Sequence, residues 1–161
     1  MFFVDIPSVV NMITTKKGDK GQTTCGNKRV DKDDLLVEVV GTIDELQAIL
    51  ELIGGKAEIV DDLSQMMGVV GCGTQIEVIK KVWGLENKIG KLEKKLPELK
   101  QFLRFKNKKA LNLNWARTVV RRLERRIVAL NKIQEIDGEV LIYFNRLSDY
   151  LFLRAREEET K

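Results

Sequence analysis

The sequence predicts an all-α protein, a bundle of about five helices that follows an irregular amino-terminal segment. Apolar residues recur at alternating spacings of three and four after residue 34, and strand-like alternation is nearly absent there. Short linkers between long amphipathic helices favour antiparallel neighbours, as in helical bundles. A length of 161 residues suits one domain with one core. We therefore expect a single domain, with a loop segment at residues 1–34 and the helical bundle at residues 35–161.

The first three expected helices are defined by apolar positions that share one side. The first begins after residue 34, the second extends over about 58–81, and the third ends or kinks at Pro97. Proline lacks an N–H to donate and disfavours helical geometry in the residue before it. The inward positions are Val39, Ile43, Leu46, Leu50 and Ile53 in the first helix, Leu63, Met66, Met67, Val70 and Val78 in the second, and Leu85, Ile89, Leu92 and Leu96 in the third.

The last two expected helices have the clearest patterns. The fourth extends over about 108–131, and the fifth is capped by Asp137 and ends at the acidic residues 157–159. An aspartate at this position accepts a hydrogen bond from an unpaired N–H of the first turn, and Ile136 and Leu141 have the spacing of a hydrophobic staple. The inward positions are Leu113, Ala116, Val120, Leu123, Ile127 and Leu130 in the fourth helix, and Phe144, Leu147, Leu151 and Ala155 in the fifth.

The composition excludes several classes of chemistry. The chain has no histidine, which removes Ser-His and Cys-His nucleophile pairs, histidine general bases and histidine metal sites. Its two cysteines, Cys25 and Cys72, cannot make a four-thiolate zinc site and fit free thiols in a reducing compartment. A net charge of +4 is too mild to identify a polyanion binder. Because no stretch reaches spanning length and no signal-peptide pattern is present, we expect a cytoplasmic protein without a membrane partner.

Residues 14–34 are rich in Gly, Thr and Lys and have no apolar period. Such a segment is either a disordered leader or surface loop, or a loop that binds an anion. In an anion-binding loop, glycines let the backbone approach a phosphate closely, and hydroxyl and ammonium groups surround the phosphate. The spacing of a Walker A loop is missing. The residues concerned are Gly18 and Gly21, the hydroxyls of Thr15, Thr23 and Thr24, and the lysines Lys16, Lys17, Lys20 and Lys32.

The fourth helix contains five arginines within residues 117–126. Arg117, Arg121 and Arg125 recur every four residues and share a face that adjoins the apolar side, whereas Arg122 and Arg126 lie about 100° away. A solvated basic face explains this pattern, and so does a phosphate site, since the guanidinium fork holds phosphates bidentately. A nucleic-acid-binding helix is a third interpretation; it would show affinity that falls steeply with salt.

Two further helices place polar residues beside apolar ones. In N-R-L-S-D-Y-L, Asn145 and Asp149 are four apart and share a face, although Asn, Ser and Asp are poor interior helix formers. Either a hydrogen-bond network between helices or a ligand site explains them. In G-T-I-D-E-L, Asp44 adjoins the apolar side of the first helix, where partial burial would require a cation. The arginines of the fourth helix are its candidate partners.

Together, T-x-x-G-D-x-G-x-T, G-T-x-D-E-L, A-R-x-x-x-R-R-x-E-R-R and N-R-L-S-D-Y-L resemble the motifs of the PduO-type ATP:cob(I)alamin adenosyltransferases, in the same order across residues 12–156. The resemblance implies a ferritin-like five-helix bundle assembled as a homotrimer, with active sites between subunits. It also implies transfer of the 5′-deoxyadenosyl group of ATP to the cobalt of cob(I)alamin, with release of triphosphate and help from Mg²⁺ bound mainly through the ATP phosphates. A reductase or a cobalamin-dependent mutase would be a further partner, and nucleic acid would not.

The resemblance also implies roles for individual residues. Asp44 and Arg117 match a salt-bridged pair that spans the subunit interface beside the corrin, and Phe102 is the candidate for an aromatic residue that faces the corrin, with Phe105 as the alternative. Asn145 matches a position that contacts the nucleotide. The nucleotide loop falls on Thr15, Lys16, Gly18, Asp19, Gly21, Thr23 and Thr24, followed by Lys32, and the triphosphate on Arg121, Arg122, Glu124 and Arg125.

The chain departs from the family pattern at several positions. The stretch 102–107 lacks the Pro and Gly residues of the usual Leu-Pro-Gly-Gly loop, and Asn114 replaces a common histidine. A catalytically weak homologue that binds or carries ATP and cobalamin is therefore the alternative function. The absence of histidine agrees with the adenosyltransferase reaction, because the cobalt is itself the nucleophile and no general base is needed.

Overall fold

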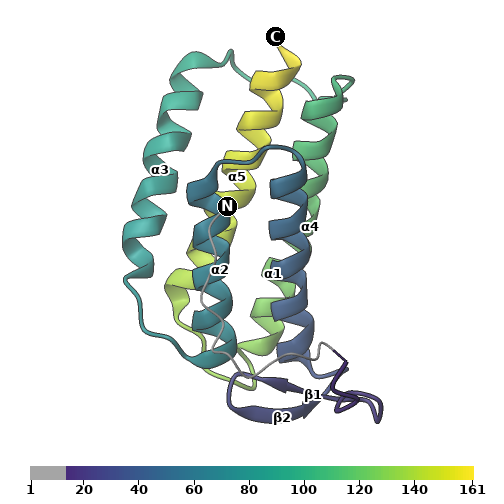
Figure 1. The fold of residues 1–161 in the computed structure, drawn as a ribbon. Coiled ribbons are helices and arrows are strands. Elements are labelled where there is room, and N and C mark those ends of the chain that lie inside the picture. The colour runs from purple at the N-terminus through teal and green to yellow at the C-terminus, as the bar shows by residue number, and fades with distance from the viewer. Residues whose placement is uncertain (1–13) are drawn as a thin grey trace.

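The computed structural model describes residues 14–161 and contains five helices and one hairpin (Figure 1). The fold class is the one that the sequence predicts. The helices are α1 (Leu35–Leu52), α2 (Ala57–Cys72), α3 (Val78–Lys95), α4 (Lys108–Leu130) and α5 (Gly138–Glu159), and the strands are β1 (Gln22–Cys25) and β2 (Lys28–Asp31).

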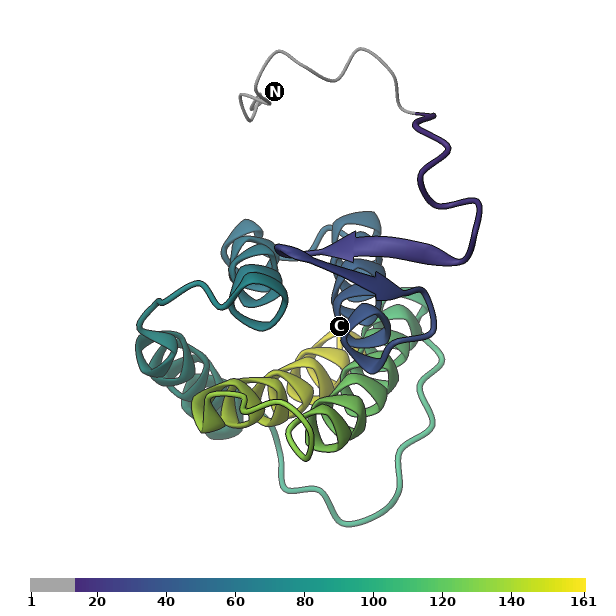
Figure 2. The same ribbon diagram turned by 90° about the horizontal axis from the view of Figure 1, so that it is seen from below.

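The helices pack as neighbours in the order α3, α5, α4, α1 and α2. Viewed along the bundle, α3, α5 and α4 form a curved row, and α1 and α2 lie against its inner side (Figure 2). Side-chain contacts also connect α2 to α3 and α5. Lys81 of α3 forms an ion pair with Asp62 of α2 at 2.5 Å, and the Tyr143 hydroxyl of α5 donates a hydrogen bond to Asp62 at 3.2 Å. The apolar faces therefore enclose one core.

The predicted apolar positions form this core. Every inward position predicted for α4 and α5 is buried, and so are those of α1 except the half-buried Ile53. Two predicted boundaries are also confirmed: the Asp137 carboxylate accepts a hydrogen bond from the N–H of Glu139 at 2.9 Å, and α3 ends two residues before Pro97. Asn107 caps α4 in the same way, accepting from the N–H groups of Lys109 and Ala110. No described helix is both long and apolar enough to cross a membrane.

The expected second helix over 58–81 is wrong at its end. Helix α2 ends at Cys72, where Gly73 adopts a left-handed conformation with φ +68. Glycine takes this conformation without steric cost, and it closes the helix by turning the chain so that later N–H groups reach the last carbonyls. Thr74 N–H accordingly donates to the Gly68 carbonyl at 3.1 Å. Val78, expected in the second helix, is instead the first residue of α3 and is buried there.

The amino-terminal segment contains a hairpin that the sequence did not predict. Strands β1 and β2 pair antiparallel, with Cys25 opposite Lys28 across a two-residue turn. Gly26 in that turn has φ +58, and a Cβ at Gly26 would lie 2.3 Å from the carbonyl oxygen of Gly71. The glycine thus serves both the turn and the close contact with α2. The hairpin lies across one end of the bundle, beside the start of α1 and the end of α2 (Figures 1 and 2).

Candidate active site between helices α4 and α5

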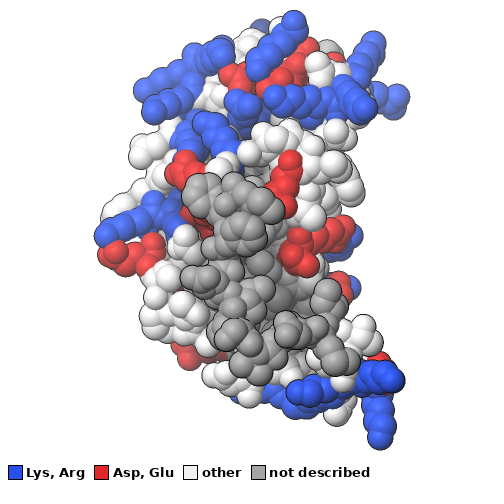
Figure 3. All heavy atoms as spheres, viewed as in Figure 1, with Lys and Arg blue, Asp and Glu red and all other residues white. Residues whose placement is uncertain are grey.

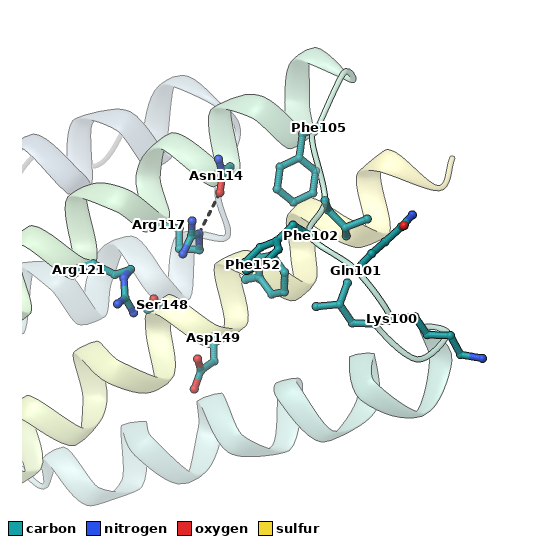
Figure 4. Close-up of a pocket in the computed structure, with 12 residues that line it drawn as sticks. Lys100, Gln101, Phe102, Phe105, Asn114, Arg117, Arg121, Ser148, Asp149 and Phe152 are labelled. Carbon is teal, nitrogen blue, oxygen red and sulfur yellow. Dashed lines mark hydrogen bonds between the residues drawn. The ribbon is translucent and has the colours of Figure 1, made fainter.

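A groove of about 670 Å³ lies between α4, α5 and the loop that joins α3 to α4 (Figure 4). The loop follows α3 and returns the chain to the start of α4, and it forms one wall of the groove. Helix α4 contributes Asn114, Arg117 and Arg121, helix α5 contributes Ser148, Asp149 and Phe152, and the loop contributes Leu99, Lys100, Gln101, Phe102, Leu103 and Phe105.

Two arginines of α4 face this groove, one turn apart. The Arg117 Nε donates a hydrogen bond to Asn114 Oδ1 at 2.9 Å, and its guanidinium lies 5.7 Å from the ring centre of Phe152. Burial and then the positive charge of Arg121 lower the pKa of Arg117 from its ordinary value. Among residues 14–161, neither arginine has a carboxylate within 4.0 Å. Two cations that face one groove without a carboxylate partner favour an anionic ligand.

Two other arginines of this helix are paired with α1. Arg122 forms an ion pair with Glu45, and Arg126 lies 3.6 Å from Glu38. Arg122 therefore lies outside the groove in this single chain, as does Arg125, which is exposed. The same helix thus has a face neutralised by α1 and a face that is not.

A polar cluster extends the site along α5. Asn145 Nδ2 donates to Glu124 Oε1 at 3.3 Å, and Arg146 donates to Asn145 Oδ1 at 3.1 Å and forms an ion pair with Glu86 of α3 at 2.9 Å. The network between helices is confirmed, and the ligand-site interpretation of the N-R-L-S-D-Y-L motif stays a prediction. Asn145 belongs to a network between helices, whereas Ser148 and Asp149 line the groove.

Asp149 is the carboxylate of the groove. Burial raises the pKa of its carboxyl from the ordinary value, Glu124 and Glu93 raise it further, and Arg146 and Arg121 oppose the shift. Asp149 also lines a second hollow of about 530 Å³ that continues between α3 and α5. It therefore lies where the two hollows meet, close enough to Arg121 for their charges to interact.

The opposite end of the groove is aromatic. Phe105 packs edge-on against Phe152, with ring centres 6.2 Å apart, whereas Phe102 is fully exposed (Figure 4). Of the two candidates for the corrin-facing aromatic, Phe102 is the one with a free ring. Lys and Arg gather at this end of the molecule (Figure 3), and those of the loop and of the start of α4 are Lys100, Arg104, Lys106, Lys108 and Lys109.

The residues expected in the nucleotide loop lie away from this groove. The segment 14–32 leads into and forms the hairpin at the far end of the bundle and contributes no side chain to the groove (Figure 1). Its residues are close to one another: the Lys32 Nζ would lie 3.2 Å from a Cβ at Gly18. Thr15, Lys16, Asp19, Gly21, Thr24 and Lys32 are exposed, and Gly18 and Thr23 are half-buried.

The expectation for Asp44 is wrong in this chain. Asp44 is exposed and, within residues 14–161, has no cation within 4.0 Å, whereas its neighbour Glu45 pairs with Arg122. The helical turn directs position 44 away from α4, so the adjacent carboxylate reaches the arginines instead. The pair between subunits that the resemblance implies for Asp44 and Arg117 stays a prediction.

Sequence reasoning missed Phe152, which contacts both Arg117 and Phe105. The sequence spacing of Phe152 could have indicated its place in the groove. Phe152 follows Ser148 by four residues and Asn145 by seven, and these spacings keep all three on one helical face. Aromatic residues on the polar side of a bundle helix are therefore a useful signal for such grooves.

Comparison with known proteins identifies the family. The family model for cobalamin adenosyltransferases matches residues 13–158. The chain belongs to this family. A corrinoid adenosyltransferase of Bacillus subtilis (strain 168) is 39% identical, covering 88% of this chain and 83% of the relative. A second relative, the corrinoid adenosyltransferase of Citrobacter freundii, is 35% identical over 92% of this chain and 95% of its own length.

Solved structures of the family have the same fold. An arginine-to-lysine variant of the PduO-type ATP:corrinoid adenosyltransferase from Lactobacillus reuteri, complexed with ATP, superposes with a TM-score of 0.78 at 31% identity, covering 92% of this chain and 94% of that one. A phenylalanine-to-histidine variant of the same enzyme, complexed with cobalamin and ATP, gives a TM-score of 0.79 at 30% identity, covering 92% and 91%. The fold of this chain is therefore that of an enzyme whose variants were solved with ATP alone and with cobalamin and ATP.

Proposed function

We propose that this chain transfers the 5′-deoxyadenosyl group of ATP to the cobalt of cob(I)alamin, releasing triphosphate. The observation that carries the proposal is the groove between α4, α5 and the preceding loop, which changes from Arg121 and Arg117 at one end to Phe152 and Phe102 at the other. An anionic leaving group suits the first end and the flat corrin ring suits the second. The relatives are corrinoid adenosyltransferases, which supports the same assignment.

The arginines would neutralise the triphosphate as it leaves. In this reaction the cobalt attacks C5′ of ATP, the C5′–O bond breaks, and its electron pair stays on the triphosphate. Charge therefore develops on the phosphate side, where fixed cations stabilise the transition state without reorganisation. Arg121 is the foremost candidate because it faces the groove with no carboxylate partner in the described chain. Arg122, Glu124, Arg125 and Asn145 would complete the triphosphate site, and Arg122 would exchange Glu45 for phosphate.

A neighbouring copy would supply the nucleotide loop. The segment with Thr15, Gly18, Gly21 and Lys32 lies at the far end of the bundle from the Phe102 loop. A homotrimer with sites between subunits would bring one copy's loop onto another copy's arginines, and it would allow Asp44 to meet a partner's arginine. The exposure of Asp44 in the single chain supports this arrangement.

The remaining tasks are orientation and exclusion of water. Phe102 would cover one face of the corrin, and the apolar wall of Phe105 and Phe152 would keep water from the reacting cobalt. Within residues 14–161 there is no group of three or more His, Cys, Asp or Glu that could hold a metal ion. Mg²⁺ would enter the proposal as a counter-ion on the phosphate oxygens of ATP.

The direct test is to incubate the protein with ATP, Mg²⁺ and chemically reduced cobalamin and to follow the corrin absorption spectrum. We expect conversion to adenosylcobalamin that requires ATP. No conversion beside an active control enzyme would contradict the proposal. Calorimetry on the same preparation separates the alternative function, because tight binding of ATP or cobalamin without turnover would indicate a carrier.

A further inference from the structure

The chain's two cysteines come together at the contact between the hairpin and the bundle. Cys25 is the last residue of β1 and Cys72 is the last residue of α2, so they are far apart in the sequence. Both are free thiols; Cys25 is half-buried and Cys72 is exposed. No part of the proposed adenosyl transfer uses either thiol.

The backbones around the two thiols are in close contact. A Cβ at Gly26 would lie 3.4 Å from the Cα of Cys72, and a Cβ at Gly71 would lie 3.8 Å from the Sγ of Cys25. Adding one Cα–Cβ bond puts the Gly26 Cα within about 5 Å of the Cys72 Cα, and the Cα of Cys25 is about 3.8 Å further along the chain. The Cys25 Cα therefore lies within about 9 Å of the Cys72 Cα. Disulfides join Cα atoms about 4.4–6.8 Å apart, so at that upper bound the hairpin end would have to move by about 2 Å for the bond to form.

The two thiols also differ in a way that suits sequential oxidation. Burial raises the pKa of the Cys25 thiol, and the charges of Cys72 and Asp34 raise it further. Cys25 is thus kept as a thiol, while Cys72 is open to solvent and meets an oxidant first. An exposed thiol beside a half-buried second thiol is the arrangement of a cysteine that is oxidised first and one that resolves it.

We propose that Cys25 and Cys72 are a redox-sensitive thiol pair whose disulfide fastens the hairpin to helix α2. Hydrogen peroxide oxidises the Cys72 thiolate to a sulfenic acid, and hydroxide leaves. The Cys25 sulfur then attacks the Cys72 sulfur, the S–O bond breaks, and the oxygen leaves as water. In sum, two thiols and one peroxide give one disulfide and two waters.

The disulfide would hold the segment that follows the proposed nucleotide loop. Thr23 and Thr24 directly precede Cys25, and β2 leads on to Lys32. A bond between Cys25 and Cys72 closes a long stretch of chain and restricts the unfolded state. The hairpin contacts the bundle through a few residues, so its opening is the motion that the disulfide would suppress.

The test uses the whole protein without ATP or cobalamin, so that its outcome is independent of the proposed reaction. After treatment with a small excess of hydrogen peroxide and removal of the oxidant, we expect the intact mass to fall by two hydrogens. A non-reducing peptide map should then contain one peptide pair joined through Cys25 and Cys72. The oxidised protein should unfold at a temperature about 5 °C higher or more, and dithiothreitol should reverse both changes.

The matched controls are Cys25→Ser and Cys72→Ser. Each should take up oxygen or remain reduced under the same treatment and should show no rise in the unfolding temperature. Three results would overturn the proposal: stepwise gain of oxygen on the wild-type protein without a linked peptide, linkage only between two copies of the chain, or a linked protein that unfolds at a lower temperature.

Discussion

Helix α4 has two basic faces with different surroundings. Arg122 and Arg126 lie opposite Glu45 and Glu38 of α1, whereas Arg117 and Arg121 face a groove with aromatic walls and no carboxylate within 4.0 Å among the described residues. The residue type and the helix are the same. The partner on the neighbouring helix, and not the arginine itself, therefore separates a structural cation from one available to a ligand.

The two faces also differ in energetic terms. Exposed ion pairs such as those on α1 contribute about 0.2–1 kcal/mol each. On the other face, burial and the neighbouring Arg121 lower the pKa of Arg117, which means that the fold holds this charge at a cost. A bound triphosphate would remove that cost. The unpaired face is therefore the one where substitution should affect function more than stability.

The largest expected effect comes from Arg121→Ala. Loss of one fixed cation that stabilises developing charge lowers kcat by about 100-fold or more. The matched control is Arg126→Ala on the paired face, which should change kcat by less than about threefold, since exposed ion pairs stabilise only weakly. Steady-state kinetics with ATP and reduced cobalamin measure both variants. Equal losses in the two variants would show that the comparison between the faces has no functional meaning.

The next effect separates the polar end of the groove from its aromatic end. Phe102→Ala removes a ring that is fully exposed among the described residues, so the unfolding temperature should stay within about 2 °C of the wild type. We expect the KM for cobalamin to rise about tenfold, with the Kd for ATP unchanged. The matched variant Phe105→Ala removes the ring that packs on Phe152 and should lower the unfolding temperature instead. If Phe102→Ala weakens ATP binding as much as corrin use, the two ends are not separate.

A third, smaller effect comes from Glu45→Gln, which removes the partner of Arg122. The free energy of unfolding should fall by less than about 1 kcal/mol, because both side chains of this pair are largely exposed. If Arg122 exchanges Glu45 for phosphate, the variant should bind ATP more tightly, by about two- to threefold. Denaturant unfolding measures the free energy of unfolding, and calorimetry measures the Kd for ATP. Weaker ATP binding in Glu45→Gln would indicate that the pair positions Arg122 rather than competing with phosphate.

The helical part of the fold was predictable because each helix buries one periodic face. The pattern failed at the end of α2, where Val78 continues the apolar sequence although Gly73 has already turned the chain. It also failed for the hairpin, whose four-residue strands are largely exposed and so have no apolar alternation to detect. The periodicity of apolar residues therefore locates long buried helices and misses short exposed strands.

The site was predictable in residue type and less so in arrangement. The sequence left open whether the arginines of α4 form a solvated face or a phosphate site, and the pairing of Arg122 with Glu45 depends on how α1 packs on α4. The packing of α1 on α4 also decides why Asp44 is exposed, although partial burial was expected. Side-chain partners between helices follow from packing angles, which no spacing within one helix specifies.

The smallest expected effect concerns Asp149, the one carboxylate among the groove-lining residues that the structure describes. Burial raises the pKa of its carboxyl, so the fold favours the protonated form. The stability contributed by this group is therefore fully present at pH values below its ordinary pKa, and it is lost as the pH rises through the raised one. Asp149→Asn imitates the protonated form, so its unfolding temperature should exceed that of the wild type at pH 7 by about 1 °C, and the difference should vanish as the pH falls below about 4. Thermal unfolding of both proteins across this pH range measures the sign of the difference in unfolding temperature. A variant that is less stable at pH 7 would mean that Arg146 and Arg121 outweigh burial, and the groove face would then resemble the paired face of α4 more closely than its geometry suggests.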